Sequence, residues 1–445
     1  MSAMKQEIEQ FRAKYPDVSE VDLIILDIPG NFYGKRYAIT ELEKLAENGL
    51  KLPRGMPLMS VQGHAIDALG HGIIDGDPDA QIELIPNSLR YVSWESEPRA
   101  QMMVRYTQGL EDTPFWEPRQ ILKQVLARFE HDNIHPVVAY ELEFYLFDQQ
   151  RTSEGLVQPP IGQRSGLRDK YAVLNMDRLA DFGECLSDIS RTCAEQQVDI
   201  GPISSEVGLG QYEINLSHHK DVLAAADQCV LFKRIVKGVA LKHGLQASFM
   251  AKPYLEHAGN GLHLHTSLYD DQGRNVFSHQ GDDTLLHAIA GVLNIMPESL
   301  SFFAPNLNAF RRLKPLSNVP VSPTWGYENR SVAARVPASD AKNTRIEYRV
   351  GGADANPYLA LASLLASIHW GLSAKQNPGP ATEVLCEEAS GIPTDLPEAL
   401  RQTEASEVLK DYLGDAFIAV YCAQKRSEIE AFEAAISARE YEWYL

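Results

Sequence analysis

Charged and apolar side chains alternate strictly between Thr344 and Val350, a pattern that predicts a half-exposed β-strand. Arg345, Glu347 and Arg349 would share one face of this strand. Two guanidiniums beside one carboxylate could hold a metal ion next to a phosphate or carboxylate group, because Arg offers a rigid fork of donors and Glu a hard oxygen ligand. Taken alone, the pattern fits a solvated edge strand with cross-strand ion pairs better, since such pairs are common and weak.

Further carboxylates lie in two other strand-like stretches. Glu141 and Glu143 interrupt the apolar run 137–147, and their spacing places both on one face of a strand. Glu206 and Glu213 flank a glycine-containing turn. Two like charges beside apolar residues cost free energy unless a cation neutralises them or one binds a proton. An exposed strand face or arginine partners would also satisfy Glu141 and Glu143, and the residues alone leave these interpretations equally open.

The stretch after the glycine-rich turn 259–261 places His263, His265 and Ser267 on one face of a strand. Two imidazoles at this spacing suit a metal or phosphate site, and a structural role is equally open. Basic residues then concentrate in one part of an acidic chain, which favours an anion-binding site over a solvated face. They are Arg311, Arg312, Arg330, Arg335, Lys342, Arg345 and Arg349.

Together these side chains predict a metal-dependent enzyme that uses ATP. Carboxylates with one or two imidazoles and no thiolates suit Mg²⁺ or Mn²⁺. Metal ions beside several arginines are what phosphoryl transfer requires, because the protein must position and neutralise charge there. The sequence contains neither a Walker A motif nor a Rossmann fingerprint, so metals and side chains would hold the nucleotide.

The elements that must position these residues alternate between strands and amphipathic helices, which predicts a mixed architecture of helices and sheets. A first unit, ending near residue 108, should contain two strands around a turn at 29–31, a short helix at 39–45, and strands near 90–94 and 102–106. The stretch 53–86 has no sustained pattern. Later helices are expected at 117–129, 179–193, 222–241, 355–371 and 417–436. The fourth of these is apolar nearly all round and should be buried.

Composition limits the possible partners. The chain has 445 residues, too many for one ordinary core, so two domains or one large unit is expected. Its 41 basic and 60 acidic residues give a net charge of −19, which would repel nucleic acid. Five scattered cysteines without a C-x-x-C motif indicate neither a disulfide framework nor a zinc site, and favour a reducing cytoplasm. No apolar run reaches the roughly 18 residues of a membrane span, so no membrane partner is expected.

A set of ordered motifs runs through the chain. They are Glu141-Leu-Glu143, the pair Glu206 and Glu213 with Gly-Gln-Tyr before the second acid, Gly259-Asn-Gly-Leu-His-Leu-His265, Asn329-Arg-Ser-Val-Ala-Ala-Arg335, Arg345-Ile-Glu-Tyr-Arg349 and Ala355-Asn-Pro-Tyr358. Together they resemble the glutamine synthetase family from end to end. The stretches 139–147, 249–259 and 347–358 are most similar to the γ-glutamylputrescine synthetase branch of that family.

The resemblance implies an α+β fold. A β-grasp domain would occupy residues 1–107, and a catalytic domain with a curved antiparallel sheet and surrounding helices would occupy 108–445. It also implies a homo-oligomer, a dodecamer of two stacked hexameric rings with active sites between neighbouring subunits. Each site would bind L-glutamate, ATP and two to three Mg²⁺ or Mn²⁺ ions. ATP would phosphorylate the γ-carboxylate of glutamate, and an unprotonated amine would then attack the acyl phosphate.

The family's site residues carry over position by position. Glu143, Glu206 and Glu213 match the first metal position, and Glu141, His263 and Glu347 match the second, beside the terminal phosphate. Gly259, Arg312 and Arg349 match glutamate-binding positions. His265, Ser267, Arg335, Lys342 and Arg345 match ATP-binding positions, and Arg330 matches a phosphate-contacting arginine. Arg330, Arg335 and Arg349 would act in catalysis.

Two positions depart from the glutamine synthetases that use ammonia. Those enzymes bind and deprotonate ammonium with a flap glutamate and an early aspartate, where this chain has Asn318 and Ser60. Loss of both acids should weaken ammonium capture and leave room for an alkyl amine at these two residues. We therefore predict a γ-glutamyl amide ligase for a polyamine, putrescine or spermidine, in polyamine catabolism. The alternatives are a glutamine synthetase that uses ammonia, a monoamine ligase, a phosphotransferase for a guanidino compound, and a non-catalytic structural or binding relative.

Overall fold

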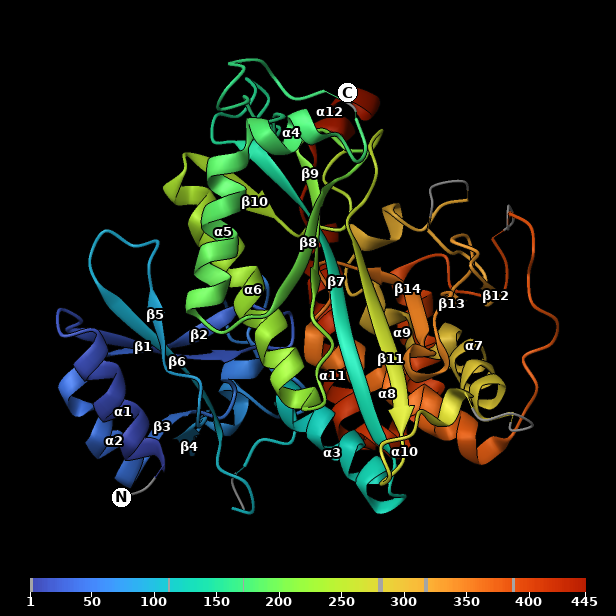
Figure 1. Cartoon of the computed structure of the whole chain (residues 1–445), viewed down its shortest axis with the longest axis horizontal. Helices are drawn as coiled ribbons and strands as arrows, with labels where there is room; N and C mark the ends of the chain where they lie inside the picture. Colours follow the sequence, from blue (N-terminus) through green and yellow to red (C-terminus); the bar gives the residue numbers. More distant parts are fainter. Residues whose placement is uncertain (1–2, 111–112, 171, 279–282, 316–318, 386–388) are drawn as a thin grey trace.

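The computed structural model describes residues 3–110, 113–170, 172–278, 283–315, 319–385 and 389–445. Two sheets organise this part of the chain, and each has its own hydrophobic core (Figure 1). The N-terminal sheet lies at the blue end of the colour scale, and the larger sheet is built around two long strands in the middle of the view.

The N-terminal sheet has the strand order β2-β1-β6-β4-β3, with β5 paired to β6. Its β1 and β6 run parallel, and its other pairs are antiparallel. The strands are β1 (Glu20–Leu26), β2 (Phe32–Ala38), β3 (Leu50–Pro53), β4 (Asp79–Leu84), β5 (Arg90–Val92) and β6 (Arg99–Tyr106), and the helices are α1 (Ala3–Lys14) and α2 (Leu42–Asn48). The predicted turn at 29–31 therefore lies between β1 and β2. The sequence missed β4, because its alternation is only six residues long and lies in a stretch rich in Gly, Pro and Asp.

The larger sheet has the strand order β12-β13-β14-β11-β7-β9-β8, with β10 paired to β7. All of its pairs are antiparallel except β12 with β13. The strands are β7 (His135–Asp148), β8 (Ile200–Ser205), β9 (Gln211–Leu216), β10 (Leu245–Ser248), β11 (Gly261–Tyr269), β12 (Trp325–Tyr327), β13 (Ala334–Val336) and β14 (Ile346–Gly352).

Helices pack against this sheet and against each other. Helices α3, α5, α6 and α7 contact its strands, and α8 packs on α3 and α7. The helices are α3 (Pro118–His131), α4 (Met176–Asp181), α5 (Gly183–Glu195), α6 (Val222–Lys242), α7 (Thr284–Phe303), α8 (Pro357–Ala374), α9 (Leu396–Ala405), α10 (Glu407–Leu413), α11 (Asp415–Glu433) and α12 (Ala438–Tyr444). As predicted from its composition, α8 is buried along nearly its whole length.

Two details of the sequence-based assignment are wrong. The helix expected at 179–193 is divided into α4 and α5, which meet at Phe182. The strand expected to be half exposed is β14, and each of its residues is buried. It is buried because β11 and β13 pair with it on both sides, and because Glu347 and Arg349 neutralise each other's charge within the protein.

The α+β class is confirmed by the two separate sheets with their packed helices. The division between residues 107 and 108 stays a prediction. Among the described helices, α7 alone is long and apolar enough to cross a membrane, but most of it is buried against the rest of the protein, as in a core helix.

Candidate active site

The candidate site lies on the larger sheet, where strand register aligns residues that are far apart in the sequence. His263 on β11 is paired with Glu141 on β7, and Glu143 on β7 is paired with Glu213 on β9. On the other side of β11, His265 is paired with Glu347 of β14. Side chains directly opposite on neighbouring strands lie close together, so the pairing of four strands assembles one cluster.

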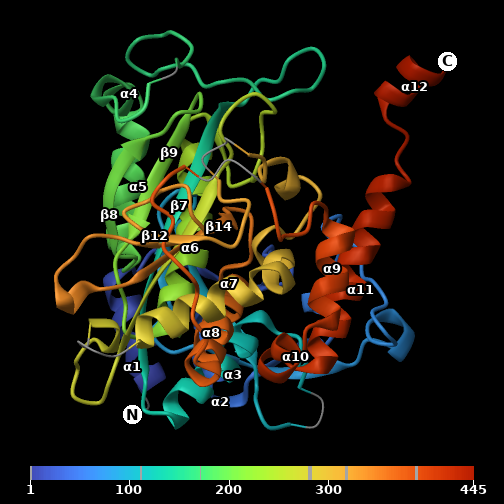
Figure 2. The same cartoon turned by 90° about the vertical axis from the view of Figure 1, so that its right-hand side faces the viewer.

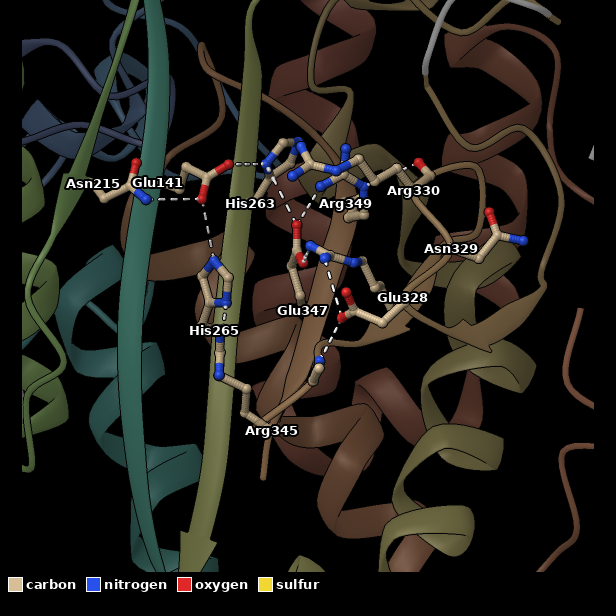
Figure 3. A network of polar contacts seen from close by, with 12 residues as sticks. Glu141, Asn215, His263, His265, Glu328, Asn329, Arg330, Arg345, Glu347 and Arg349 are labelled. Carbon is tan, nitrogen blue, oxygen red and sulfur yellow. Dashed lines mark hydrogen bonds and ion pairs between the residues drawn. The ribbon is translucent and has the colours of Figure 1, made fainter. Parts of the chain in front are cut away.

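Glu141 is at the centre of this cluster (Figure 3). Its Oε1 lies 2.6 Å from Nδ1 of His263, and its Oε2 lies 3.4 Å from Nε2 of His265. The same Oε2 accepts a hydrogen bond of 3.2 Å from the amide of Asn215 on β9. The two imidazoles predicted from their spacing therefore face the same carboxylate.

Glu347 is almost fully buried between two arginines. Arg335 donates to its Oε2 at 2.7 Å, and Arg349 donates to its Oε1. Nδ1 of His263 lies 3.9 Å from the same Oε1, so this imidazole is located between the carboxylates of Glu141 and Glu347. Burial alone would raise the pKa of Glu347. The positive charges of Arg349, His263 and His265 outweigh the effect of burial, so the pKa of Glu347 lies below its ordinary value.

The carboxylates on the other side of His263 are crowded. Burial and the negative charges of Glu141 and Glu143 raise the pKa of Glu213 to about 10. Burial and the charge of Glu143 raise the pKa of Glu206 to about 7. Despite burial, His263 and His265 hold the pKa of Glu141 below its ordinary range. These acids repel each other, and a cation between them would relieve the repulsion.

The donor set fits a divalent metal ion. Glu141, Glu213 and His263 each offer a ligand atom, and these atoms lie within 4.8 Å of one another. Carboxylate oxygens with one imidazole match the preference of Mg²⁺ and Mn²⁺. The resemblance placed Glu213 in one metal position and the other two residues in the next, and the structure brings the two positions into contact.

The predicted glutamate-binding residues lie at the adjacent end of β11. A side-chain carbon at Gly259 would meet Ala251 O at 2.5 Å and Cγ of Arg312 at 2.8 Å, so only glycine permits this approach. Arg312 is buried and donates to Val350 O at 2.8 Å. Burial lowers the pKa of Arg312 to about 10, partly offset by the charge of Glu143.

The predicted nucleotide residues lie at the other end of the cluster. Nε of Arg345 is 3.3 Å from Nδ1 of His265, and Arg335 also contacts the exposed Glu328 at 3.3 Å. The hydroxyl of Ser267 donates to Thr344 O at 3.0 Å. The side chain of Lys342 is exposed at this edge of the sheet. Arg330 offers its carbonyl to Nε of Arg349 at 3.2 Å.

Ser60 and Asn318 are the two residues predicted to shape the amine site, and the structure describes only the first of them. Ser60 lies in the N-terminal unit, where its hydroxyl accepts hydrogen bonds from the backbone of Gln62 and His64. It therefore holds its own loop together. Asn318 lies outside the described residues.

Sequence reasoning missed residues that support the site. Gln211 and Asn215 share a face of β9 with Glu213, so the same period of two could have identified both. Arg178 and Asp169 form a buried ion pair of 2.6 Å, and no periodic pattern in the sequence predicts it. Arg178 donates to Glu206 O at 2.5 Å and to Gly208 O at 2.8 Å, and thereby fixes the turn that carries Glu206.

Comparisons with known proteins agree with this fold. The family model described as the glutamine synthetase catalytic domain matches residues 116–444. γ-Glutamylputrescine synthetase PuuA of Escherichia coli is 38% identical, with 100% of this chain and 95% of the relative aligned. Glutamine synthetase of Pyrococcus furiosus is 34% identical over 89% of this chain and 87% of its own length.

A further relative and a solved structure extend the comparison. Glutamate–isopropylamine ligase of a Pseudomonas species is 30% identical, with 96% of this chain and 95% of the relative aligned. The structure of GmaS without ligand superposes with a TM-score of 0.81 at 25% identity, covering 97% of this chain and 98% of that one.

The chain belongs to the glutamine synthetase family. Its predicted membership and the predicted glutamine-synthetase type of fold are confirmed. The predicted enzyme class, a ligase that forms γ-glutamyl amides, is confirmed by the same relatives. The family depends on ATP and divalent metal ions, and the cluster around His263 provides ligands for such an ion.

Proposed function

We propose that this protein is an ATP-dependent ligase that joins the γ-carboxylate of L-glutamate to a polyamine, putrescine or spermidine, through γ-glutamyl phosphate. The observation that carries the proposal is the position of His263, which lies between the carboxylate cluster of Glu141 and Glu213 and the buried group of Glu347, Arg335 and Arg349. A cation site therefore directly adjoins an anion site, which is the arrangement that phosphoryl transfer requires.

In the first step, the phosphorylation of glutamate, one group of residues would hold the metal ions. Glu143, Glu206 and Glu213 would hold one Mg²⁺ or Mn²⁺ ion, and Glu141, His263 and Glu347 a second, so that each site holds two to three ions. When bound, these ions neutralise the terminal phosphate of ATP and the charge that develops during its transfer.

Arginines orient the two anionic substrates. Arg312 and Arg349 with Gly259 would bind glutamate, and His265, Ser267, Arg335, Lys342 and Arg345 would bind ATP. Glu347 holds Arg335 and Arg349 in fixed directions, so their remaining donors are set before a substrate arrives. Arg330 would contact the phosphate during transfer.

The choice of amine is supported by the relatives and by the lost acids. The relatives aligned over nearly the whole chain include enzymes named for putrescine and for isopropylamine. At the positions where ammonia-using enzymes have acids, this chain has the uncharged Ser60 and Asn318. Both observations favour an alkyl amine over ammonium, and the greater identity to the putrescine enzyme favours a polyamine and a role in polyamine catabolism.

The proposed setting is a cytoplasmic dodecamer of two hexameric rings. Exposed apolar side chains in the stretch 61–74 support an interface between copies: Val61, Leu69, Ile73 and Ile74. In such an assembly, Ser60 of one subunit could reach the site of a neighbour.

The experiment is a measurement of phosphate release with ATP, L-glutamate and Mg²⁺ and a panel of amines: ammonium, putrescine, spermidine, isopropylamine, ethanolamine and an aromatic amine. We expect kcat/KM for putrescine or spermidine to exceed that for ammonium by at least about tenfold, which corresponds to about 1.4 kcal/mol in transition-state binding. Mass spectrometry of the product should identify a γ-glutamyl amide.

The same experiment distinguishes the other candidates. The identity to a Pyrococcus glutamine synthetase favours ammonia as the second candidate substrate, and ammonium would then give the highest kcat/KM. A monoamine ligase would prefer isopropylamine or ethanolamine. Phosphate release or ADP formation without an amide product would indicate a different phosphotransfer reaction, and binding of ATP without any turnover would indicate a non-catalytic relative.

A further inference from the structure

Gln211 is a buried residue at the start of β9 that contacts several parts of the site at once. Its side chain is 1% exposed, and it faces the region between the metal carboxylates and the predicted glutamate-binding loop. Gln211 lies in the Gly-Gln-Tyr motif before Glu213, but the sequence by itself assigns it no role in the reaction. Its hydrogen bonds indicate one.

The amide nitrogen of Gln211 faces acceptors from strand β7 and from the loop before β11. Its Nε2 lies 3.2 Å from Oε2 of Glu143, 3.0 Å from Gly259 O and 3.2 Å from Oδ1 of Asn260. The two hydrogens of one amide are therefore shared among a predicted metal ligand, the backbone of a predicted glutamate position and a second buried amide.

The amide oxygen of Gln211 is also occupied. It accepts a hydrogen bond of 2.9 Å from Gly208 N, in the turn that follows Glu206. This bond fixes the orientation of the amide, because the oxygen must face Gly208 and the nitrogen must then face Glu143 and Gly259. Arg178 holds the same turn from its other side through Gly208 O.

The consequence for Glu143 is a defined orientation of its carboxylate. Its Oε2 accepts two hydrogen bonds, one from Gln211 and one of 2.6 Å from Gly261 N. Because both donors bind one oxygen, a cation would be ligated through the other, Oε1. Hydrogen-bond partners of metal ligands commonly contribute as much as 10- to 100-fold to metal affinity, because they fix the direction of the ligand.

The consequence for Gly259 is a fixed backbone. Its neighbour Asn260 is fully buried, and the amide of Asn260 donates to Ser248 O at 3.3 Å and to Met250 O at 2.9 Å. Gln211 thus joins the carboxylate of Glu143 to a loop that is itself hydrogen-bonded to residues 248–250. One side chain connects the two predicted binding positions.

We propose that Gln211 is a positioning residue that orients Glu143 toward the metal ion and holds Gly259 in place for glutamate. It would act through its hydrogen bonds to these two residues. The proposal rests on the proposed function for the identity of the two ligands.

The test uses Mn²⁺ as the probe and the full chain without ATP. Electron paramagnetic resonance of free Mn²⁺ gives the Kd for the metal, and steady-state assays give the KM for L-glutamate. Gln211→Met keeps the length of the side chain and removes its donors and acceptor. Gln211→Asn keeps an amide but retracts it by one methylene, so it cannot span from Gly208 to Glu143. We expect both variants to raise the Kd for Mn²⁺ about 10- to 100-fold, and to raise the KM for glutamate.

The matched control is Gln101→Met. Gln101 is fully buried in β6, where it bonds Gln196 at 2.8 Å and Arg234 at 2.7 Å, away from the candidate site. Its loss should lower Tm, as any broken buried hydrogen bond does, and leave the Kd for Mn²⁺ unchanged. A purely structural role of Gln211 would give this same pattern.

The outcomes separate this proposal from the proposed function. If the wild type binds Mn²⁺ and either folded Gln211 variant binds it within about twofold of the wild type, Gln211 does not position Glu143 and this inference is wrong. If the wild type itself binds no Mn²⁺, the proposed function fails, and the inference fails with it. Gln211→Asn leaves only a small cavity, so it tests the proposal even where Gln211→Met does not fold.

Discussion

Glu347 shows how a single charged residue organises the site. Its two oxygens are held by Arg335 and Arg349, and its side chain is only 2% exposed. A carboxylate in this position sets the direction of both guanidiniums and keeps them from repelling each other. Removing its charge would leave the buried Arg349 and the partly buried Arg335 without their common partner, which is costly in an environment of low dielectric constant.

We expect Glu347→Gln to lower kcat for amide synthesis at least about 100-fold, because it removes both a predicted metal ligand and the counter-charge of the two arginines. The variant keeps the shape of the side chain, so circular dichroism should show a folded protein with a lower Tm. Phosphate release with ATP, glutamate and the preferred amine is the measurement.

Glu404→Gln is the control for this variant. Glu404 also pairs with an arginine, Arg426, but both side chains are nearly half exposed. Exposed pairs contribute little to stability, and this change should leave kcat within about twofold. Near-normal turnover of Glu347→Gln would mean that β14 carries structural ion pairs and no catalytic charge.

At the scale of elements, the turn between β1 and β2 joins the two sheets. Asp27 accepts hydrogen bonds from the backbone and side chain of Asn31, at 2.6 and 3.0 Å. The backbone of this turn accepts from Nδ2 of Asn356, which also caps the first turn of α8. Because α8 follows β14 directly, the turn is connected to the strand that carries Glu347 and Arg349.

The turn should make stability depend on pH. Burial raises the pKa of Asp27 to about 7, although the hydrogen bonds from Asn31 lower it in part. Between about pH 4 and 7, the folded chain keeps a proton on Asp27 that the unfolded chain has lost. The folded state binds more protons, so rising pH lowers the free energy of unfolding across this window, on the order of a few kcal/mol in all.

We expect Asp27→Asn to remove part of the fall in Tm between pH 5 and pH 8, because Asn does not ionise. The variant should start from a lower Tm at pH 5, since one contact with Asn31 is lost. Thermal melts at fixed protein concentration measure both effects. The exposed Asp17 is the control, and Asp17→Asn should keep the pH dependence of the wild type. An unchanged fall in Asp27→Asn would show that other groups cause it.

At the scale of the whole molecule, the C-terminal segment extends away from the body of the chain (Figure 2). It ends in α12, and its aromatic side chains are exposed: Tyr441, Trp443 and Tyr444 are 55%, 65% and 79% exposed. Ile436 just before the helix is also exposed. Exposure of this apolar surface to water costs free energy in a monomer. We therefore expect the segment to contact another copy of the chain.

We expect a chain that ends at residue 436 to form a smaller assembly than the full-length protein. Multi-angle light scattering after size-exclusion chromatography measures the mass, and the full chain should give twelve copies of the 49.6-kDa subunit. Loss of the segment removes buried apolar area at the interface and should reduce that number. The control is the full-length Glu442→Gln variant, which changes charge in the same helix and should keep the full mass. An unchanged mass after truncation would exclude the segment from the interface.

The sequence by itself predicted which residues of the candidate site share the face of a strand. The period of two along 137–147, 259–267 and 344–350 placed acids and histidines on common strand faces, and such a local pattern follows from the geometry of one strand. The apolar composition of 355–371 likewise predicted a buried helix, because no polar face was left for water.

The tertiary structure decided how those faces meet. Glu141 contacts His263 and Asn215, which are 122 and 74 residues away in the chain, and only the register of β7 with β11 and β9 makes them neighbours. Register between distant strands depends on packing of the whole sheet, which no local pattern contains. For the same reason, the burial of β14 and the hydrogen bonds that join Gln211 to Glu143 and Gly259 could not be predicted from the sequence.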